Sequence, residues 1–303
     1  MEYRTLGRTG ERVSAIGIGG AHIARAERAE AIQIVRTAID NGITFMDNCW
    51  DYSGGNAEVL MGEALRDGYR EKVFLMTKID GHTASAAAQQ IDQCLSRLQT
   101  DRLDLVQIHE VIRMDDPDRV FAPGGTMEAL LAAKQAGKIR YIGFTGHKDP
   151  DIHLKMLGMD FDWDTVQMPL NCVDTHHRSF EARVLPVLVE RNIGVLGMKP
   201  LAAGQAVKQG VATAEECLRY AMSLPTSVVI TGCDSLAIAE QAIRVWKAFE
   251  PMSAGEMDAL RARTAGAAQG GVLEGYKTSE SFDGTIKNPH WLTTATVVLD
   301  AAD

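Results

Sequence analysis

Four ionisable side chains of different chemistry each stand just past a short apolar run that is typical of a buried strand: Asp47, Tyr52, Lys78 and His109. In a parallel barrel the ends of such strands converge on one rim, where catalytic groups collect, so we expect the four to meet. A free tyrosine ionises near pH ~10, so a Tyr that exchanges protons at neutral pH needs help from a buried charge network. The four residues therefore predict a site of proton transfer.

The elements that would position these groups alternate between strand-like and helix-like patterns. The expected strands are 15–20, 43–47, 73–77, 103–108, 138–143, 164–167, 193–198 and 227–231. The expected helices are 28–41, 56–66, 84–98, 125–136, 150–157, 179–191, 213–223 and 235–248. Eight such α/β units favour a closed (β/α)8 TIM barrel, because a doubly wound sheet more often stops at about five or six strands.

Two further segments flank the predicted barrel. The Thr9-Gly10 pair lies between two short alternating runs, which indicates an N-terminal β-hairpin that lids one end. Residues 251–303 form a C-terminal extension, with a helical pattern around 254–263 followed by an irregular tail. We interpret the tail as packed on the barrel, with closure over the rim and the substrate pocket as the alternative. No linker divides the chain, so residues 1–303 are expected to form a single barrel domain.

Composition limits the partners of the protein. The chain has 40 acidic and 31 basic residues, a net charge of -9, and no Lys/Arg block. This balance argues against a nucleic-acid partner or an acidic membrane surface. The sequence also lacks an apolar leader and any run of about 18 apolar residues, so we expect a cytoplasmic protein without a membrane partner.

The sequence predicts no metal site. Its five cysteines lack metal-ligand spacing and are expected to be reduced thiols. The pair His176 and His177 has no third ligand at a suitable spacing and is interpreted as solvated loop. The acidic patch of Asp115, Asp116 and Asp118 resembles no calcium loop and is interpreted in the same way.

Several motifs in the right order make the chain resemble the aldo-keto reductase superfamily to about residue 250. They are LGRTG at 6–10, Asp-x4-Tyr at 47–52, TK at 77–78, IH at 108–109, IRYIGFTGH at 139–147, VQMPLN at 166–171, GMKPL at 197–201 and ITGCDSLAIAEQ at 230–241. The resemblance implies an NAD(P)(H)-dependent oxidoreductase that interconverts an alcohol and a small-molecule carbonyl, whether aldehyde, ketone or sugar. It also implies that the dinucleotide binds across the barrel mouth without a GxGxxG turn.

The resemblance assigns a role to each of the four ionisable residues. Tyr52 matches the general acid that gives a proton to the carbonyl oxygen. Lys78 matches the cation that lowers the pKa of the tyrosine, and Asp47 would hold that lysine. His109 would donate a hydrogen bond that orients the carbonyl and supports its developing negative charge.

Three neighbouring residues have less specific roles. Trp50 and His22 are candidate walls of the substrate pocket, and simple packing is the alternative for Trp50. Cys49 lies between Asp47 and Tyr52 and is interpreted as a packed small apolar residue.

The resemblance also implies a cofactor site on the later strands. Gln167 would hold the nicotinamide carboxamide, and Thr145 stands where the family usually has Ser. Gly146 and Met198 depart from the family, which has Asn and an aromatic ring there, although Met still supplies polarizable apolar contact. The other matched positions are Lys199, Pro200, Leu201, Gly232, Cys233, Asp234, Glu240 and Gln241. The loop at 232–235 precedes a helix, so its amides would face a phosphate.

The family habit and the residues differ on the choice of cofactor. The resemblance favours NADP(H), whose 2′-phosphate is commonly held by an Arg at the position of Ala237. Asp234 would repel that phosphate and could accept a hydrogen bond from the free hydroxyl of NAD(H). The Ser235 hydroxyl and the helix amides could still hold a phosphate. We expect NADP(H) to be favoured, NAD(H) to remain open, and discrimination to be weak because a bidentate clamp is missing.

Two other functions remain open. One is a lyase that forms a Schiff base on Lys78, although Asp47 argues against it because a paired carboxylate keeps a lysine charged. The other is a regulatory or structural subunit that binds the dinucleotide with little turnover. The sequence specifies neither the substrate nor the direction of the reaction nor the oligomeric state.

Overall fold

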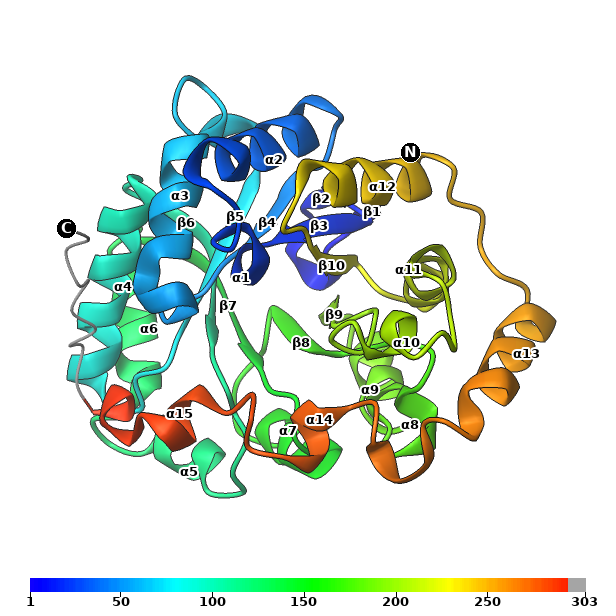
Figure 1. Ribbon diagram of the computed structural model, residues 1–303. Coiled ribbons are helices and arrows are strands. Elements are labelled where there is room, and N and C mark those ends of the chain that lie inside the picture. The colour runs from blue at the N-terminus through cyan, green and yellow to red at the C-terminus, as the bar shows by residue number, and fades with distance from the viewer. Residues whose placement is uncertain (294–303) are drawn as a thin grey trace.

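A closed barrel of eight parallel strands forms the centre of the protein (Figure 1). The computed structural model describes residues 1–293. The barrel strands are β3 (Ile16–Gly19), β4 (Phe45–Asp47), β5 (Phe74–Ile79), β6 (Leu103–Ile108), β7 (Ile139–Thr145), β8 (Thr165–Pro169), β9 (Gly194–Met198) and β10 (Val228–Gly232). Each pairs with the next along the chain, and β10 pairs back to β3 in parallel register. The predicted TIM barrel is confirmed.

Helices surround the barrel. Those in the barrel region are α1 (Gly20–Ile23), α2 (Arg28–Asp40), α3 (Asn56–Ala64), α4 (Ala84–Leu98), α5 (Asp116–Phe121), α6 (Thr126–Gln135), α7 (Pro150–Leu157), α8 (Phe180–Arg183), α9 (Leu185–Glu190), α10 (Gln205–Lys208), α11 (Ala214–Ser223) and α12 (Leu236–Lys247). Short 3-10 turns lie at Gly7–Thr9, Tyr52–Gly55, Arg70–Lys72 and Asp174–His176. The helix expected at 179–191 is divided into α8 and α9, because Pro186 has no amide hydrogen with which to continue the first one.

The N-terminal hairpin closes one end of the barrel. Strands β1 (Tyr3–Thr5) and β2 (Arg12–Ser14) pair antiparallel, as predicted. Leu6, at the turn between them, is fully buried and packs with Phe45, Phe74 and other residues of the barrel interior. A Cβ on Gly194, the first residue of β9, would lie 2.9 Å from the Leu6 side chain. The hairpin therefore covers the end at which the strands begin.

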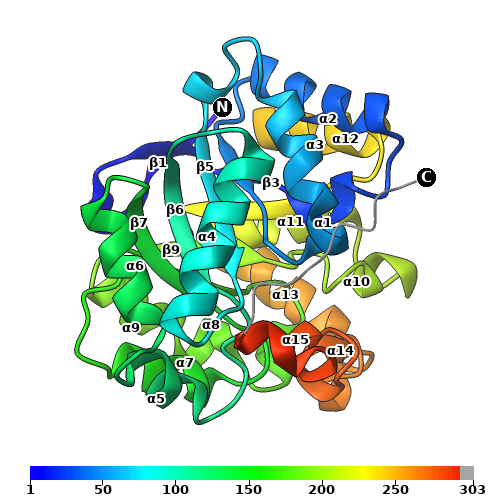
Figure 2. The ribbon, with the colours of Figure 1, turned by 90° about the vertical axis from the view of Figure 1, so that its left-hand side faces the viewer.

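The C-terminal segment packs against the opposite rim, and Figure 2 shows α14 and α15 on the far side of the barrel from β1. It contains α13 (Ala254–Ala265), α14 (Gly275–Thr278), α15 (Gly284–Lys287) and 3-10 turns at Gln269–Gly271 and Pro289–Leu292. Residues just past four strand ends contact this segment. The His82 amide donates to the Leu292 carbonyl, and Glu110 accepts from the Thr285 amide. The His147 ring lies within hydrogen-bond distance of Asp283, and Asn171 donates to the Tyr276 hydroxyl. These contacts favour closure over the rim. Residues 294–303 of the expected extension lie outside the described residues.

The core has two layers. An inner cluster fills the barrel below the rim, and a larger one lies between the strands and the surrounding helices. All five cysteines are buried free thiols. In the part of the chain that the structure describes, no helix is long and apolar enough to span a membrane.

Candidate active site

Three of the four predicted residues meet at the ends of β4 and β5. Lys78 Nζ donates to Asp47 Oδ1 at 2.8 Å, to the Asn48 carbonyl at 2.7 Å and to the Tyr52 hydroxyl at 3.3 Å. Asp47 is 2% exposed and Lys78 1%. The ammonium is therefore held in a buried ion pair that also reaches the phenol.

The loop after β4 turns sharply immediately after Tyr52. The three residues that follow have positive φ angles, 52° at Ser53, 64° at Gly54 and 97° at Gly55. Glycine adopts this conformation at little cost, so two of the three positions suit the turn. The chain then enters α3 directly.

Tyr52 is held as a neutral phenol. Burial and the nearby carboxylate of Asp47 raise the pKa of its hydroxyl well above the ordinary value. The role implied for Lys78, that its ammonium favours the phenolate, stays a prediction, and the 3.3 Å contact of its Nζ with the hydroxyl is consistent with it. A protonated phenol is nevertheless the form that a proton donor requires.

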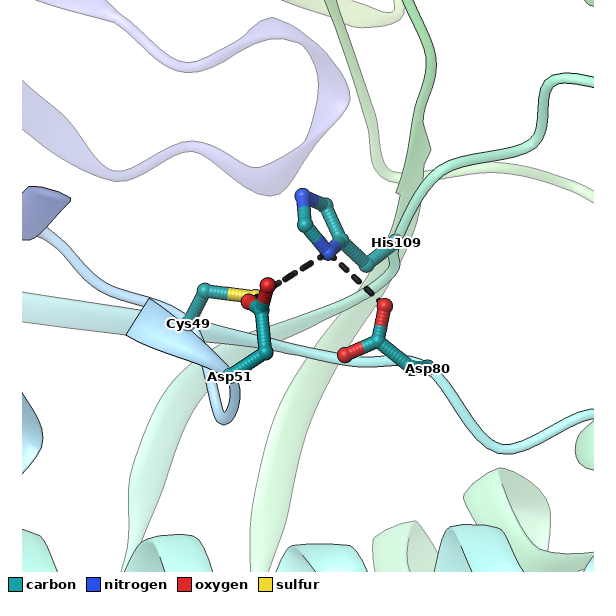
Figure 3. A group of neighbouring side chains, drawn as sticks. All are labelled: Cys49, Asp51, Asp80 and His109. Atoms are coloured by element: carbon teal, nitrogen blue, oxygen red, sulfur yellow. Dashed lines mark hydrogen bonds and ion pairs between the residues drawn. The ribbon is translucent and has the colours of Figure 1, made fainter. Parts of the chain in front are cut away.

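His109 lies beside the phenol at the end of β6, with the Tyr52 and His109 rings edge-on and their centroids 5.9 Å apart. Its Nδ1 is 2.9 Å from Asp80 Oδ1, 3.7 Å from Asp51 Oδ1 and 3.2 Å from Cys49 Sγ (Figure 3). Figure 3 shows the other ring nitrogen, Nε2, pointing away from both carboxylates. All four predicted residues are thus brought together.

Sequence reasoning missed Asp51 and Asp80 as members of this site. The signal was their position, since Asp51 directly precedes Tyr52 and Asp80 follows Lys78 by two residues at the same strand exit. Burial alone would lower the pKa of His109, but the two carboxylates raise it to about 9. Burial and Asp80 in turn raise the pKa of Asp51 to about 6. The two carboxylates therefore favour the charged form of the imidazole.

This group also brings together side chains of the kinds that bind metals. One ligand atom each from Cys49, Asp51, Asp80 and His109 lies within 4.8 Å of the others. The 2.9 Å contact between Asp80 and His109 has the length of a charge-assisted hydrogen bond, which needs a proton on Nδ1. We therefore interpret the group as an ion-pair cluster, and the absence of a metal stays a prediction.

The nicotinamide side of the predicted cofactor site has one group that fits. Gln167 Nε2 donates to Asp47 Oδ2 at 2.8 Å. Its Oε1 atom is buried and has no hydrogen-bond partner among the described residues. A carboxamide NH2 is a suitable donor for this oxygen.

Thr145, the last residue of β7, and Gly146, which follows it, are both packed tightly. Thr145 is 1% exposed, and its carbonyl accepts from the Val111 amide. A Cβ on Gly146 would lie 2.3 Å from the Val111 carbonyl oxygen. The loop after β6 thus leaves no room for the asparagine that the family commonly has at this position.

Lys199 presents a cation just past β9. Its φ angle is 53°, and its Nζ lies 3.6 Å from Met198 Sδ and 5.3 Å from the centre of the Tyr276 ring. No carboxylate lies within ion-pair distance of it in the described part of the chain. Burial and the nearby Lys78 lower the pKa of Lys199 to about 8. Lys199 therefore offers a partly desolvated cation to an anionic group. Pro200 and Leu201 form the turn that follows it in the chain.

The loop after β10 leads into the N-terminus of α12, and two acidic residues lie near this end of the helix. Ser235 caps the helix by accepting from the Ile238 amide, and Glu30 of α2 accepts from the Leu236 amide at 3.0 Å. Asp234 lies in the same loop, between a buried Cys233 and this cap. Two carboxylates thus stand where a phosphate was expected. Glu240 and Gln241 are exposed on α12.

The two predicted pocket walls lie in different places. Trp50 is fully buried, donates to Gln93 and meets Trp291 edge-on at 5.7 Å between ring centroids, which favours the packing role. His22 lies against the loop after β10, since a Cβ on Gly232 would come within 2.2 Å of its Nδ1. His22 thus borders the predicted cofactor loop.

Comparison with known proteins gives the same family as the motifs. The Aldo/keto reductase family matches residues 15–210. L-galactose dehydrogenase of Arabidopsis thaliana is 30% identical over 231 residues, covering 69% of this chain and 68% of that protein. The holo structure of aldo-keto reductase AKR11C1 from Bacillus halodurans has a TM-score of 0.75 at 23% identity, covering 90% of this chain and 99% of that one. An aldo/keto reductase from Klebsiella pneumoniae in complex with NADP and acetate has a TM-score of 0.69 at 24% identity, covering 88% and 96%. The chain therefore belongs to the aldo/keto reductase family of NAD(P)-dependent oxidoreductases.

Proposed function

We propose that the protein interconverts a carbonyl and an alcohol by hydride transfer, with Tyr52 as the general acid. The observation that carries this proposal is the buried contact of Lys78 Nζ with both Asp47 Oδ1 at 2.8 Å and the Tyr52 hydroxyl at 3.3 Å. Tyr52 gives its phenolic proton to the carbonyl oxygen, and Lys78 stabilises the phenolate that remains. The reduced nicotinamide supplies the hydride when it is bound.

Several residues are suited to hold that nicotinamide dinucleotide. The buried Gln167 Oε1 would accept from the carboxamide, and Met198 would supply apolar contact. Lys199 would face a phosphate. NADP(H) is supported by the NADP complex of the Klebsiella pneumoniae relative. Because Glu30 and Asp234 both lie near the start of α12, we keep NAD(H) as an alternative and expect weak discrimination.

The substrate is proposed as a small aldehyde, ketone or sugar. One relative is an L-galactose dehydrogenase, which is a reason to test aldoses in both directions of the reaction. The ion pair of Lys78 with Asp47 weakens the Schiff-base alternative, because a charged ammonium is not a nucleophile.

A panel of aldehydes, ketones and aldoses, followed by nicotinamide absorbance with each cofactor, tests the proposal. We expect carbonyl-dependent oxidation of reduced cofactor by the native protein. The Tyr52→Phe variant should lose about 10²- to 10⁴-fold in rate while it binds cofactor with similar affinity. Cofactor binding with no turnover on the whole panel would instead favour the regulatory subunit.

A further inference from the structure

Two carboxylates and a thiol surround one nitrogen of His109. Asp80 Oδ1 is 2.9 Å from Nδ1, Cys49 Sγ is 3.2 Å away, and Asp51 Oδ1 is 3.7 Å away. Asp80 has no exposed surface, and its Oδ2 has no hydrogen-bond partner among residues 1–293. Burying carboxylates this closely costs free energy unless a positive charge compensates them. The imidazole is placed to carry that charge.

We propose that Asp80, assisted by Asp51, is a positioning residue that keeps His109 protonated on both ring nitrogens, so that a charged Nε2–H faces the substrate carbonyl. The inference rests on the proposed carbonyl reduction and adds to it the charge state of the hydrogen-bond donor. Figure 3 supports the geometry, since Nδ1 faces the carboxylates while Nε2 points away from them. The His109 side chain is 10% exposed, so it is not sealed inside the barrel.

A charged donor matters because Tyr52 is a weak acid in this site, its pKa raised by burial and by Asp47. During reduction the carbonyl carbon accepts the hydride, the electrons of the C=O π bond move to oxygen, and oxygen takes the Tyr52 proton. The phenolate that remains later regains a proton from water. A charged hydrogen bond from His109 stabilises the oxygen while negative charge builds on it, and does so more strongly than a neutral imidazole would.

Several ionisable groups surround His109. Asp51, Cys49 and Tyr52 face it from the loop after β4, Asp80 faces it from the end of β5, and Glu110 is its neighbour in sequence. Burial raises the pKa of the Cys49 thiol well above its ordinary value, so the thiol stays neutral. Glu110 contributes to the same upward shift of the His109 pKa as the two aspartates. The compensating charges are thus the carboxylates, and Asp80 is the one in hydrogen-bond contact.

NMR titration of the histidine ring nitrogens in the full chain, without cofactor or substrate, tests the proposal directly. The His109 signal is assigned by its loss in His109→Asn. We expect His109 to titrate at a pKa of about 9 in the native protein, and about 1 to 3 units lower in Asp80→Asn, because an opposite charge has been removed. Cys49→Ala removes a neutral neighbour and should keep the pKa raised. If Asp80→Asn does not fold, Asp51→Asn applies the same test with a smaller shift.

Single-turnover rates against pH supply the second readout. In Asp80→Asn we expect a loss of about tenfold or more at pH 8 that is largely recovered near pH 6, where the imidazole regains its charge. A purely structural role of Asp80 would lower the rate equally at every pH. If no carbonyl is reduced, the proposed function fails, while the NMR titration still decides the charge of His109.

Two outcomes would overturn the inference. One is a native His109 that titrates near the ordinary value of about 6.5. The other is one equivalent of zinc retained by the purified protein and lost in Asp80→Asn, because a metal on Nδ1 would take the place of the proton.

Discussion

Gln167 donates a 2.8 Å hydrogen bond to Oδ2 of Asp47, the carboxylate whose Oδ1 binds Lys78. The contact crosses the barrel from β8 to β4. It fixes the amide so that Oε1 stays free for a donor, and it gives Asp47 a second partner. One buried carboxylate thus links the proposed proton-transfer side of the pocket to the proposed nicotinamide side.

Lys78→Met is expected to remove both activity and stability. The change leaves Asp47 buried with only the Gln167 amide as a side-chain partner. An unpaired buried charge typically costs about 3 to 5 kcal/mol, and we expect the lower part of that range because the amide remains. Thermal unfolding followed by circular dichroism measures the change.

The matched control for this variant is the double change Asp47→Asn with Lys78→Met, which removes both charges. Its Tm should recover much of the loss while activity stays absent. A Lys78→Met protein that is inactive but melts with the native protein would show that Asp47 is not left as an uncompensated charge.

Most of the barrel follows from sequence periodicity, because each strand is a short apolar run followed by a helical repeat. The four catalytic candidates were found for the same reason, since parallel strands bring their ends to one rim. Helix α5 was missed because its acidic residues were interpreted as solvated loop. Asp116 is in fact fully buried and accepts from the amides of Ile112 and Arg113.

The parts that could not be predicted depend on contacts between distant segments. Whether Asp80 is a solvated strand-end residue or the partner of His109 is decided by the neighbouring strand. Whether the tail closes over the rim is decided by hydrogen-bond acceptors on the rim. One of these is Glu110, whose carboxylate accepts from the amides of Gly284 and Thr285. Periodicity within one segment carries no information on either pairing.

Gly146→Ala is expected to destabilise the fold. The added Cβ would lie 2.3 Å from the Val111 carbonyl oxygen and 2.9 Å from the His153 ring, so the backbone after β6 must move. Overpacking of this kind costs about 1 to 3 kcal/mol. Gly255→Ala in α13 is the control, because its Cβ meets nothing within 4 Å and alanine favours a helix. Equal melting temperatures of the two variants would contradict the tight packing at Gly146.

Cofactor discrimination is expected to be weak in the native protein, with NADPH and NADH affinities within about tenfold of each other. Asp234→Arg should favour NADPH by at least a further tenfold, because a guanidinium forms paired hydrogen bonds with phosphate. Asp234→Asn removes only the repulsion and should shift the ratio less. Fluorescence titration with both cofactors measures the ratios. A thousandfold native preference for NADPH would mean that a phosphate clamp exists elsewhere, whereas the same preference for NADH would identify Asp234 and Glu30 as the selectors.

Acid should weaken the fold through His147, which meets Asp283 of the C-terminal segment at 2.9 Å and is 4% exposed. Burial lowers the pKa of His147 to about 4. The folded pKa therefore lies below the unfolded value, so the unfolded chain binds the proton first. The stability contributed by neutral His147 is complete above pH ~6.5 and is lost as the pH falls towards 4, by about 3 kcal/mol in all.

His147→Gln removes this titration and keeps a donor for Asp283. The native protein cannot be interpreted alone, because Asp51, with its pKa raised to about 6, opposes the trend by binding a proton in the folded state. The difference in unfolding free energy between native and variant, from denaturant titrations at matched pH, cancels the contribution of Asp51 and reports on His147 together with its partner Asp283. We expect the native protein to lose about 2 kcal/mol relative to the variant between pH 7 and 5. His153→Gln is the parallel case, since burial lowers the pKa of His153 to about 4 as well, but its ring faces the Gln167 carbonyl at 3.4 Å. If the difference in unfolding free energy does not change with pH, the prediction is wrong. His147 would then be charged in the folded protein, or exposed to solvent beneath the tail.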